Sequence, residues 1–246
     1  MALDTEAALS GVLTHGHEWQ SWRALRLSDE APGDVPSTRD QDGEGGFYGP
    51  SGRPSPGATG EALCHLTFLG LDVSGPATVA ADWLQAVRTP AEAWLDAPDD
   101  VPGELENPAA GRVWATASAS CALLAVGRDP GHRAIDLLRG EADLEGRFTG
   151  GAYPTFAAAG AYWLAQGPQT EMAEWALRWA REWQEEWWAE WEFVTALTFW
   201  AAARIPAEHP SVETFLDLLV SRAPPAGWDT DVELTLRTLE LVHYFT

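Results

Sequence analysis

The stretch FTGGAYPTFAAAGAYWLAQG, residues 148–167, decides the fold of this chain. It places Phe148 seven positions before Thr155 and continues as an almost wholly apolar run. The same seven-position spacing recurs twice at a fixed interval, in the pair Trp188 and Thr195 and in the pair Trp228 and Thr235. A period of about 40 residues is too long for one helix or hairpin, so each unit must be a supersecondary element that buries its apolar face against its neighbours.

The repeat extends towards the N-terminus. Thr116 precedes Thr155 by nearly the same interval and opens a similar apolar run, and Thr59 opens a fifth copy at a longer interval before Thr116. The longer interval is explained by a Pro-, Gly- and acid-rich insertion at 95–111, which is typical of a loop. Five copies therefore cover most of the chain.

Each copy divides into two helical halves. The half that starts at the threonine is apolar on all sides, and its partner mixes apolar residues with arginine and acids, as an outer helix does. We expect an all-α fold, an α/α toroid of about five hairpins with inner apolar helices surrounded by amphipathic outer ones. The whole chain, 1–246, forms one domain in this interpretation: an N-terminal helix at 1–27, a flexible loop at 28–46 and repeats at 47–246.

In three segments the end of an expected outer helix is followed by a glycine or an aromatic residue, namely 82–94, 136–148 and 217–228. The segment 42–49 has the sequence DGEGGFYG. In these segments the chain resembles the α/α-toroid superfamily of terpenoid cyclases and protein prenyltransferase β-subunits. The resemblance is one of repeat pattern and covers most of the chain from position 40 onwards. It implies an apolar isoprenoid-type substrate inside the toroid.

Composition restricts the class of partner. The net charge is -22 and 46% of residues are hydrophobic. Such a negative charge opposes binding to nucleic acid and docking on anionic membranes. No run of 18 apolar residues predicts a transmembrane segment, and the acidic N-terminus differs from a signal peptide, so we expect a cytoplasmic protein.

The strongest candidates for catalysis lie ahead of the last inner helix, in GWDTDVELTLRTLEL. They are Asp229, Asp231 and Glu233. In the resemblance, class II terpene cyclases carry an Asp-x-Asp-Asp motif in this setting, one acid of which protonates an alkene or epoxide. Matching threonine to threonine puts Glu233 at the central acid and Leu234 at the last aspartate. The alternative is that these acids cap the helix, as acids near a helix start commonly do.

Aromatic residues occupy equivalent positions in the repeats and are candidates for binding a substrate. A ring of aromatic faces would suit a carbocation or a quaternary ammonium group, and it would equally suit an apolar ligand. The alternative is packing between the helix layers. One tier stands two positions before the threonines, at Trp114, Tyr153 and Phe193, and a second tier comprises Phe148, Trp188 and Trp228.

Metal and cofactor sites are weakly indicated. Cys64, His65 and Cys121 resemble part of a zinc set, but adjacent residues on one helix diverge by about 100 degrees, which favours buried thiols. The acids at 96–104, namely Asp96, Asp99, Asp100 and Glu104, are expected to be solvated. No cofactor is therefore expected, apart from Mg²⁺ if the substrate is a diphosphate.

Two functions follow from these observations. The first is a terpene-cyclase-like enzyme, an isomerase or lyase, that cyclises or isomerises an apolar isoprenoid-type substrate in the lumen by acid initiation. The alternative is a non-catalytic α/α toroid that binds a lipophilic small molecule or a protein partner.

Overall fold

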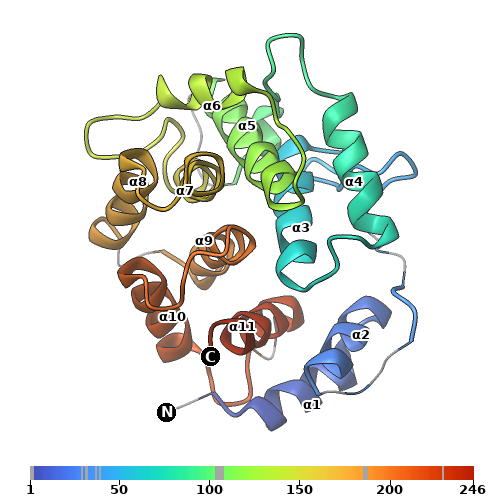
Figure 1. Cartoon of the computed structure of the whole chain (residues 1–246). Coiled ribbons are helices and arrows are strands. Elements are labelled where there is room, and N and C mark those ends of the chain that lie inside the picture. Colours follow the sequence, from blue (N-terminus) through green and yellow to red (C-terminus); the bar gives the residue numbers. More distant parts are fainter. Residues whose placement is uncertain are drawn as a thin grey trace.

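The computed structural model describes residues 3–28, 30, 33–36, 38, 40–102, 108–184, 188–228 and 230–246. Over these ranges the regular elements are helices, joined by loops that hold three isolated β-bridges. The inner helices are α3 (Pro56–Phe68), α5 (Pro108–Ala125), α7 (Ala152–Gln166), α9 (Glu190–Ala202) and α11 (Val232–Phe245). The outer helices are α4 (Gly75–Ala86), α6 (His132–Arg139), α8 (Glu171–Glu182) and α10 (Pro210–Arg222). The all-α, α/α-toroid prediction is confirmed (Figure 1).

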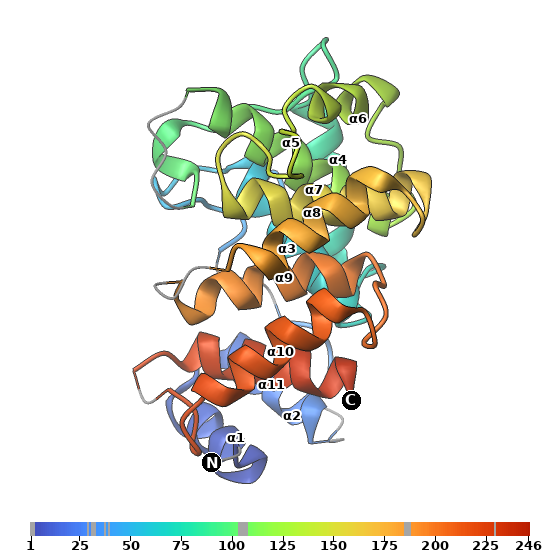
Figure 2. The same ribbon diagram turned by 90° about the vertical axis from the view of Figure 1, so that its left-hand side faces the viewer.

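The N-terminal region forms two helices, where the sequence had suggested one. They are α1 (Thr5–His15) and α2 (Glu18–Leu27). The chain leaves the helical conformation at Gly16, where a side chain would come within 2.6 Å of the Val12 carbonyl. Both helices pack against α11 (Figure 2). The N-terminal hairpin therefore covers the last inner helix.

The repeated threonines connect each inner helix to the turn before it. The Thr155 hydroxyl accepts a hydrogen bond from the Phe148 backbone N–H at 2.9 Å, and Thr235 accepts one from Trp228 at 2.8 Å. The seven-position spacing is thus the separation along the chain between the backbone N–H donor and the threonine that accepts its hydrogen bond. Two further copies use longer connections, with Thr59 accepting from Phe47 and Thr116 accepting from Trp94.

Two of these turns share a detailed form, at 42–47 and 143–148. In each, the first aspartate accepts backbone hydrogen bonds from residues two to four positions later. Gly45 and Gly146 adopt φ angles of 110° and 94°, where side chains are disfavoured. A Cβ on either would lie 2.5 Å from the backbone of an outer helix, α4 or α8. The glycine step therefore lets the turn pack directly on its neighbouring outer helix.

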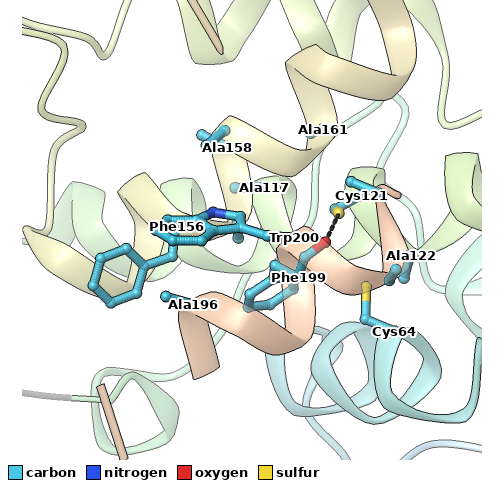
Figure 3. Close-up of a cluster of buried hydrophobic side chains, with 14 of the residues drawn as sticks. Cys64, Ala117, Cys121, Ala122, Phe156, Ala158, Ala161, Ala196, Phe199 and Trp200 are labelled. Carbon is cyan, nitrogen blue, oxygen red and sulfur yellow. Dashed lines mark hydrogen bonds between the residues drawn. The ribbon is translucent and has the colours of Figure 1, made fainter. Parts of the chain in front are cut away.

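The centre of the molecule is filled by side chains. Helices α3, α5, α7 and α9 close on one another, with α9 in contact with α3. Small residues allow the close approach: a Cβ on Gly60 would lie 2.5 Å from the Ser118 backbone, and one on Gly160 would lie 2.7 Å from the Cys121 sulfur. Figure 3 shows Cys64, Cys121 and the aromatic side chains that occupy this space.

Helix α11 packs beside α9, on the outside of this closed group of four. Between α11 and α3 lies a seam that α2 covers (Figure 1). None of the described helices is both long and apolar enough to cross a membrane.

Candidate functional site

The seam between α3 and α11 contains a cavity of about 360 Å³. This volume lies in the range of small-molecule sites. Its walls are formed by helices α2 and α3, the N-terminal half of α11, and loop residues from position 38 and from 40–48. The lining residues are His17, Trp19, Gln20, Arg23, Thr38, Asp40, Phe47, Tyr48, Ala58, Glu61, Ala62, His65, Leu66, Glu233 and Arg237.

The walls of this cavity, which we call the seam cavity, differ in polarity. Aromatic and aliphatic side chains come from α2, the loop and one face of α3, as with Trp19, Phe47 and Ala62. Carboxylates come from the loop, α3 and α11, and guanidinium groups come from α2 and α11. Three carboxylates and two guanidinium groups line it, so its own charge is negative.

A buried ion cluster forms the floor of the seam cavity. Arg23 is 2% exposed and donates two hydrogen bonds to the Glu240 carboxylate, at 2.7 and 2.6 Å. Its third nitrogen lies 2.7 Å from Glu233, which also pairs with Arg237 at 3.2 Å. His65 Nε2 lies 2.9 Å from the Glu240 carboxylate. Buried charges are stable only when they are paired in this way.

The cluster fixes the protonation states of its members. Burial raises the pKa of Glu240, but Arg23 outweighs it and holds the pKa at about 2. Burial also raises the pKa of Glu233, but the charges of Arg23 and Arg237 outweigh burial and hold this pKa well below the usual range. Burial and the two arginines lower the pKa of His65 to about 4. At neutral pH both carboxyls are therefore ionised and the imidazole is neutral.

The predicted catalytic acids have structural partners. Asp231 is the N-cap of α11, and its carboxylate accepts hydrogen bonds from the Leu234 N–H at 2.9 Å and the Trp191 indole at 3.0 Å. Its position agrees with the helix-cap interpretation. Glu233 does line the seam cavity, yet as an ionised carboxylate it is poorly suited to donate a proton. Asp229 lies outside the described residues.

The residues of the two predicted aromatic tiers pack against different neighbours. Trp114 and Tyr153 contact each other edge to face, with centroids 6.2 Å apart, at the N-terminal end of the inner helices. The others pack between helix layers, where Phe148 contacts Tyr162, Trp188 contacts Phe156, and Phe193 contacts Phe215. Trp228 borders a separate hollow beside α1. None of the six lines the seam cavity.

The prediction of solvated acids in the insertion is wrong for Asp96 and Asp100. Asp100 is 4% exposed and accepts a hydrogen bond from the Ser51 N–H at 2.9 Å. Asp96 accepts one from the Gly57 N–H at 2.9 Å, and burial raises its pKa to about 7. Asp99 is exposed, and Glu104 lies outside the described residues. Half-buried Asp96 holds the insertion against the start of α3, and buried Asp100 holds it against the preceding turn, contacts that local composition does not reveal.

The two cysteine thiols proposed for zinc lie near each other, but His65 is directed elsewhere. Cys64 and Cys121 are fully buried in the filled centre, where burial raises the pKa of the Cys64 thiol. His65 instead turns towards Arg23 and Glu240. Within the described ranges, no group of three or more His, Cys, Asp or Glu could hold a metal ion.

The residues of the candidate site that the sequence did not reveal are Arg23, Glu240 and Gln20. Arg23 and Glu240 are 217 positions apart, and Gln20 donates to Glu233 at 3.0 Å across 213 positions. Each lies on a helix that reads as an ordinary amphipathic or apolar segment. Only the folded arrangement brings them together.

No family model matches the chain, and no curated protein matches its sequence. Among solved structures, the chain is similar to the type II terpene cyclase MstE from Scytonema without ligand, with 17% identity and a TM-score of 0.46, covering 91% of this chain and 70% of that one. The structure of a variant of that cyclase in complex with geranylgeranyl dihydroxybenzoate has 15% sequence identity and a TM-score of 0.49, and the match covers 98% of this chain and 86% of that one. The structure of another variant in complex with merosterolic acid A has 14% sequence identity and a TM-score of 0.48, and the match covers 98% of this chain and 85% of that one. The fold assignment itself rests on the helices of this chain.

Proposed function

We propose that this protein binds an apolar, isoprenoid-type small molecule in the seam cavity. The observation that carries the proposal is the cavity itself, about 360 Å³ in volume, with an apolar wall facing an ion-paired floor. Pockets of this size and mixed lining are the usual form of small-molecule sites. The filled centre of the toroid leaves the seam as the better place for a ligand.

The charges of the seam cavity favour a neutral or cationic ligand over a diphosphate. Arg23 is fully engaged by Glu233 and Glu240, and Arg237 is engaged by Glu61 and Glu233. Neither guanidinium is free to clamp a phosphate without leaving a carboxylate unpaired, which is costly. This arrangement also gives no reason to require Mg²⁺ for binding.

Isothermal titration calorimetry with all-trans farnesol tests the proposal. Ala62 lines the seam cavity, so Ala62→Leu fills part of its volume and should weaken binding about tenfold or more. Ala86→Leu adds the same side chain at an exposed position on α4 and should leave the affinity unchanged. Equal affinities for the parent and Ala62→Leu, or no binding by the parent, would contradict the proposal.

Acid-initiated cyclisation of the bound molecule is the second candidate, because Glu233 borders the seam cavity. The ion pairs of Glu233 oppose it, since a proton donor must first be protonated. Turnover of a panel of isoprenoids should fall in Glu233→Gln and Asp231→Asn if these acids act, and unchanged turnover in both would exclude them. Asp229→Asn belongs to the same comparison.

A further inference from the structure

A second cavity lies at the other end of the seam. It has a volume of about 320 Å³ and is bordered by α2 and by the C-terminal ends of α3 and α11. Arg23 borders both cavities, and its buried contacts with Glu240 lie between them. The ion cluster therefore divides the seam into two compartments, and we call this one the distal cavity.

The wall of the distal cavity combines aromatic and aliphatic side chains with charged and polar ones. Trp22 and Leu27 come from α2, Phe68 ends α3, Leu69 follows it, and Tyr244 lies near the end of α11. Phe68 and Tyr244 contact each other edge to face, with centroids 5.7 Å apart. The apolar side chains of this wall bury part of an aliphatic chain away from water.

The charge available at the distal cavity is positive, in contrast to the seam cavity. The Arg26 guanidinium lies over the Trp22 ring at 5.2 Å and donates one hydrogen bond to the Leu69 carbonyl at 3.1 Å. No carboxylate of the described residues lies within ion-pair distance of Arg26. Glu240, the acid in this wall, is already held by Arg23 and His65.

We propose that the distal cavity is a second binding site, which takes an amphipathic carboxylate such as a medium-chain fatty acid. The aliphatic chain of the ligand packs between Trp22, Phe68 and Tyr244, and its carboxylate pairs with Arg26. A guanidinium already oriented over an aromatic ring presents its remaining N–H groups to a carboxylate in a fixed geometry. The site is independent of the ligand proposed for the seam cavity.

Calorimetric titration of the full chain with dodecanoate and with 1-dodecanol tests this proposal. Arg26→Gln should weaken dodecanoate binding about fivefold or more and leave dodecanol binding unchanged, because only the carboxylate uses the charge. Arg53→Gln removes an exposed arginine whose side chain makes a 3.5 Å hydrogen bond to Ser51, and it should change neither affinity.

The variant Ala62→Leu separates the two sites. It fills the seam cavity, so it should weaken farnesol binding but leave dodecanoate binding intact. Dodecanoate binding that is unaffected by Arg26→Gln, or that is lost in Ala62→Leu, would overturn the proposal even if the seam cavity does bind farnesol. Because Arg26 is exposed, its variant should keep the parent's thermal unfolding midpoint, which verifies that the fold is intact.

Discussion

The closed group of four inner helices and the seam beside α11 are built from the same repeat, yet one is filled and the other is hollow. In the closed group, Gly60 and Gly160 bring helix backbones together and aromatic rings occupy the remaining space. In the seam, α2 lies between α3 and α11 and contributes Arg23, whose charge must be matched by acids on the facing helix.

The difference shows that the repeat determines the positions of the helices, while a few residues determine whether the space between them is open. Glycines remove the space between two helices because they allow the helices to come into direct contact. A buried ion cluster preserves it, because charged side chains that are fully paired cannot collapse onto the apolar wall without losing their partners. Binding is therefore expected where the repeat is interrupted by the N-terminal hairpin.

The largest effect is expected from breaking the seam. Arg23→Met leaves the buried Glu240 carboxylate with only the neutral His65 imidazole as a partner, and should lower the free energy of unfolding by about 3–5 kcal/mol in urea denaturation. The double variant Arg23→Met with Glu240→Leu removes both charges and should recover part of that loss. Arg53→Met, at an exposed position, should change stability by less than about 0.5 kcal/mol. A loss below about 1 kcal/mol in Arg23→Met would show that the cluster is not a structural partition.

The filled region is tested by a pair of glycine variants. In Gly60→Ala the new Cβ meets the Ser118 backbone at 2.5 Å, so the helices must separate and stability should fall by about 1–3 kcal/mol. Gly11→Ala in α1 meets nothing within 4 Å and should stabilise the protein by about 0.5–1 kcal/mol through helix propensity. The same change thus has opposite signs in urea denaturation, and equal effects at both positions would refute the close packing.

A smaller effect is expected from the acid that holds the insertion against α3. The pKa of Asp96 is about 7 when folded, so the folded state retains this proton while the unfolded chain loses it near pH 4. Ionisation of Asp96 should therefore lower the stability of the parent relative to Asp96→Asn between about pH 4 and pH 7.

Asp96→Asn should not show this loss, and at pH 8 it should be about 1–2 kcal/mol more stable than the parent, with the difference disappearing near pH 4. Asp99→Asn, at the exposed neighbour, should follow the parent at every pH. A pH-independent difference between Asp96→Asn and the parent would contradict the burial of this carboxyl.

Much of the fold could be predicted because its information is local and periodic. Thr155 and Phe148 are only seven positions apart, so their hydrogen bond leaves a signature in the sequence. The break in the N-terminal helix at Gly16 was missed because a glycine within an amphipathic segment is compatible with either outcome.

The site could be predicted only in part. Glu233 was identified by its place in the repeat, but its ionised state depends on Arg23, which is 210 positions away. The surroundings of the two aromatic tiers could not be predicted, because the repeat period does not specify helix rotation, which turns Phe193 towards Phe215 of α10. Long-range pairing and rotational phase are the two properties that one sequence leaves open.

Thiol modification tests the contrast between the filled centre and the hollow seam most directly. Cys64 and Cys121 are fully buried, so the native parent should not react with a polar aromatic disulfide reagent. Ala62→Cys places a thiol on the wall of the seam cavity and should react at one thiol per chain, with farnesol slowing the reaction. Reaction of the parent's cysteines in the native state, or an unreactive Ala62→Cys, would contradict this account.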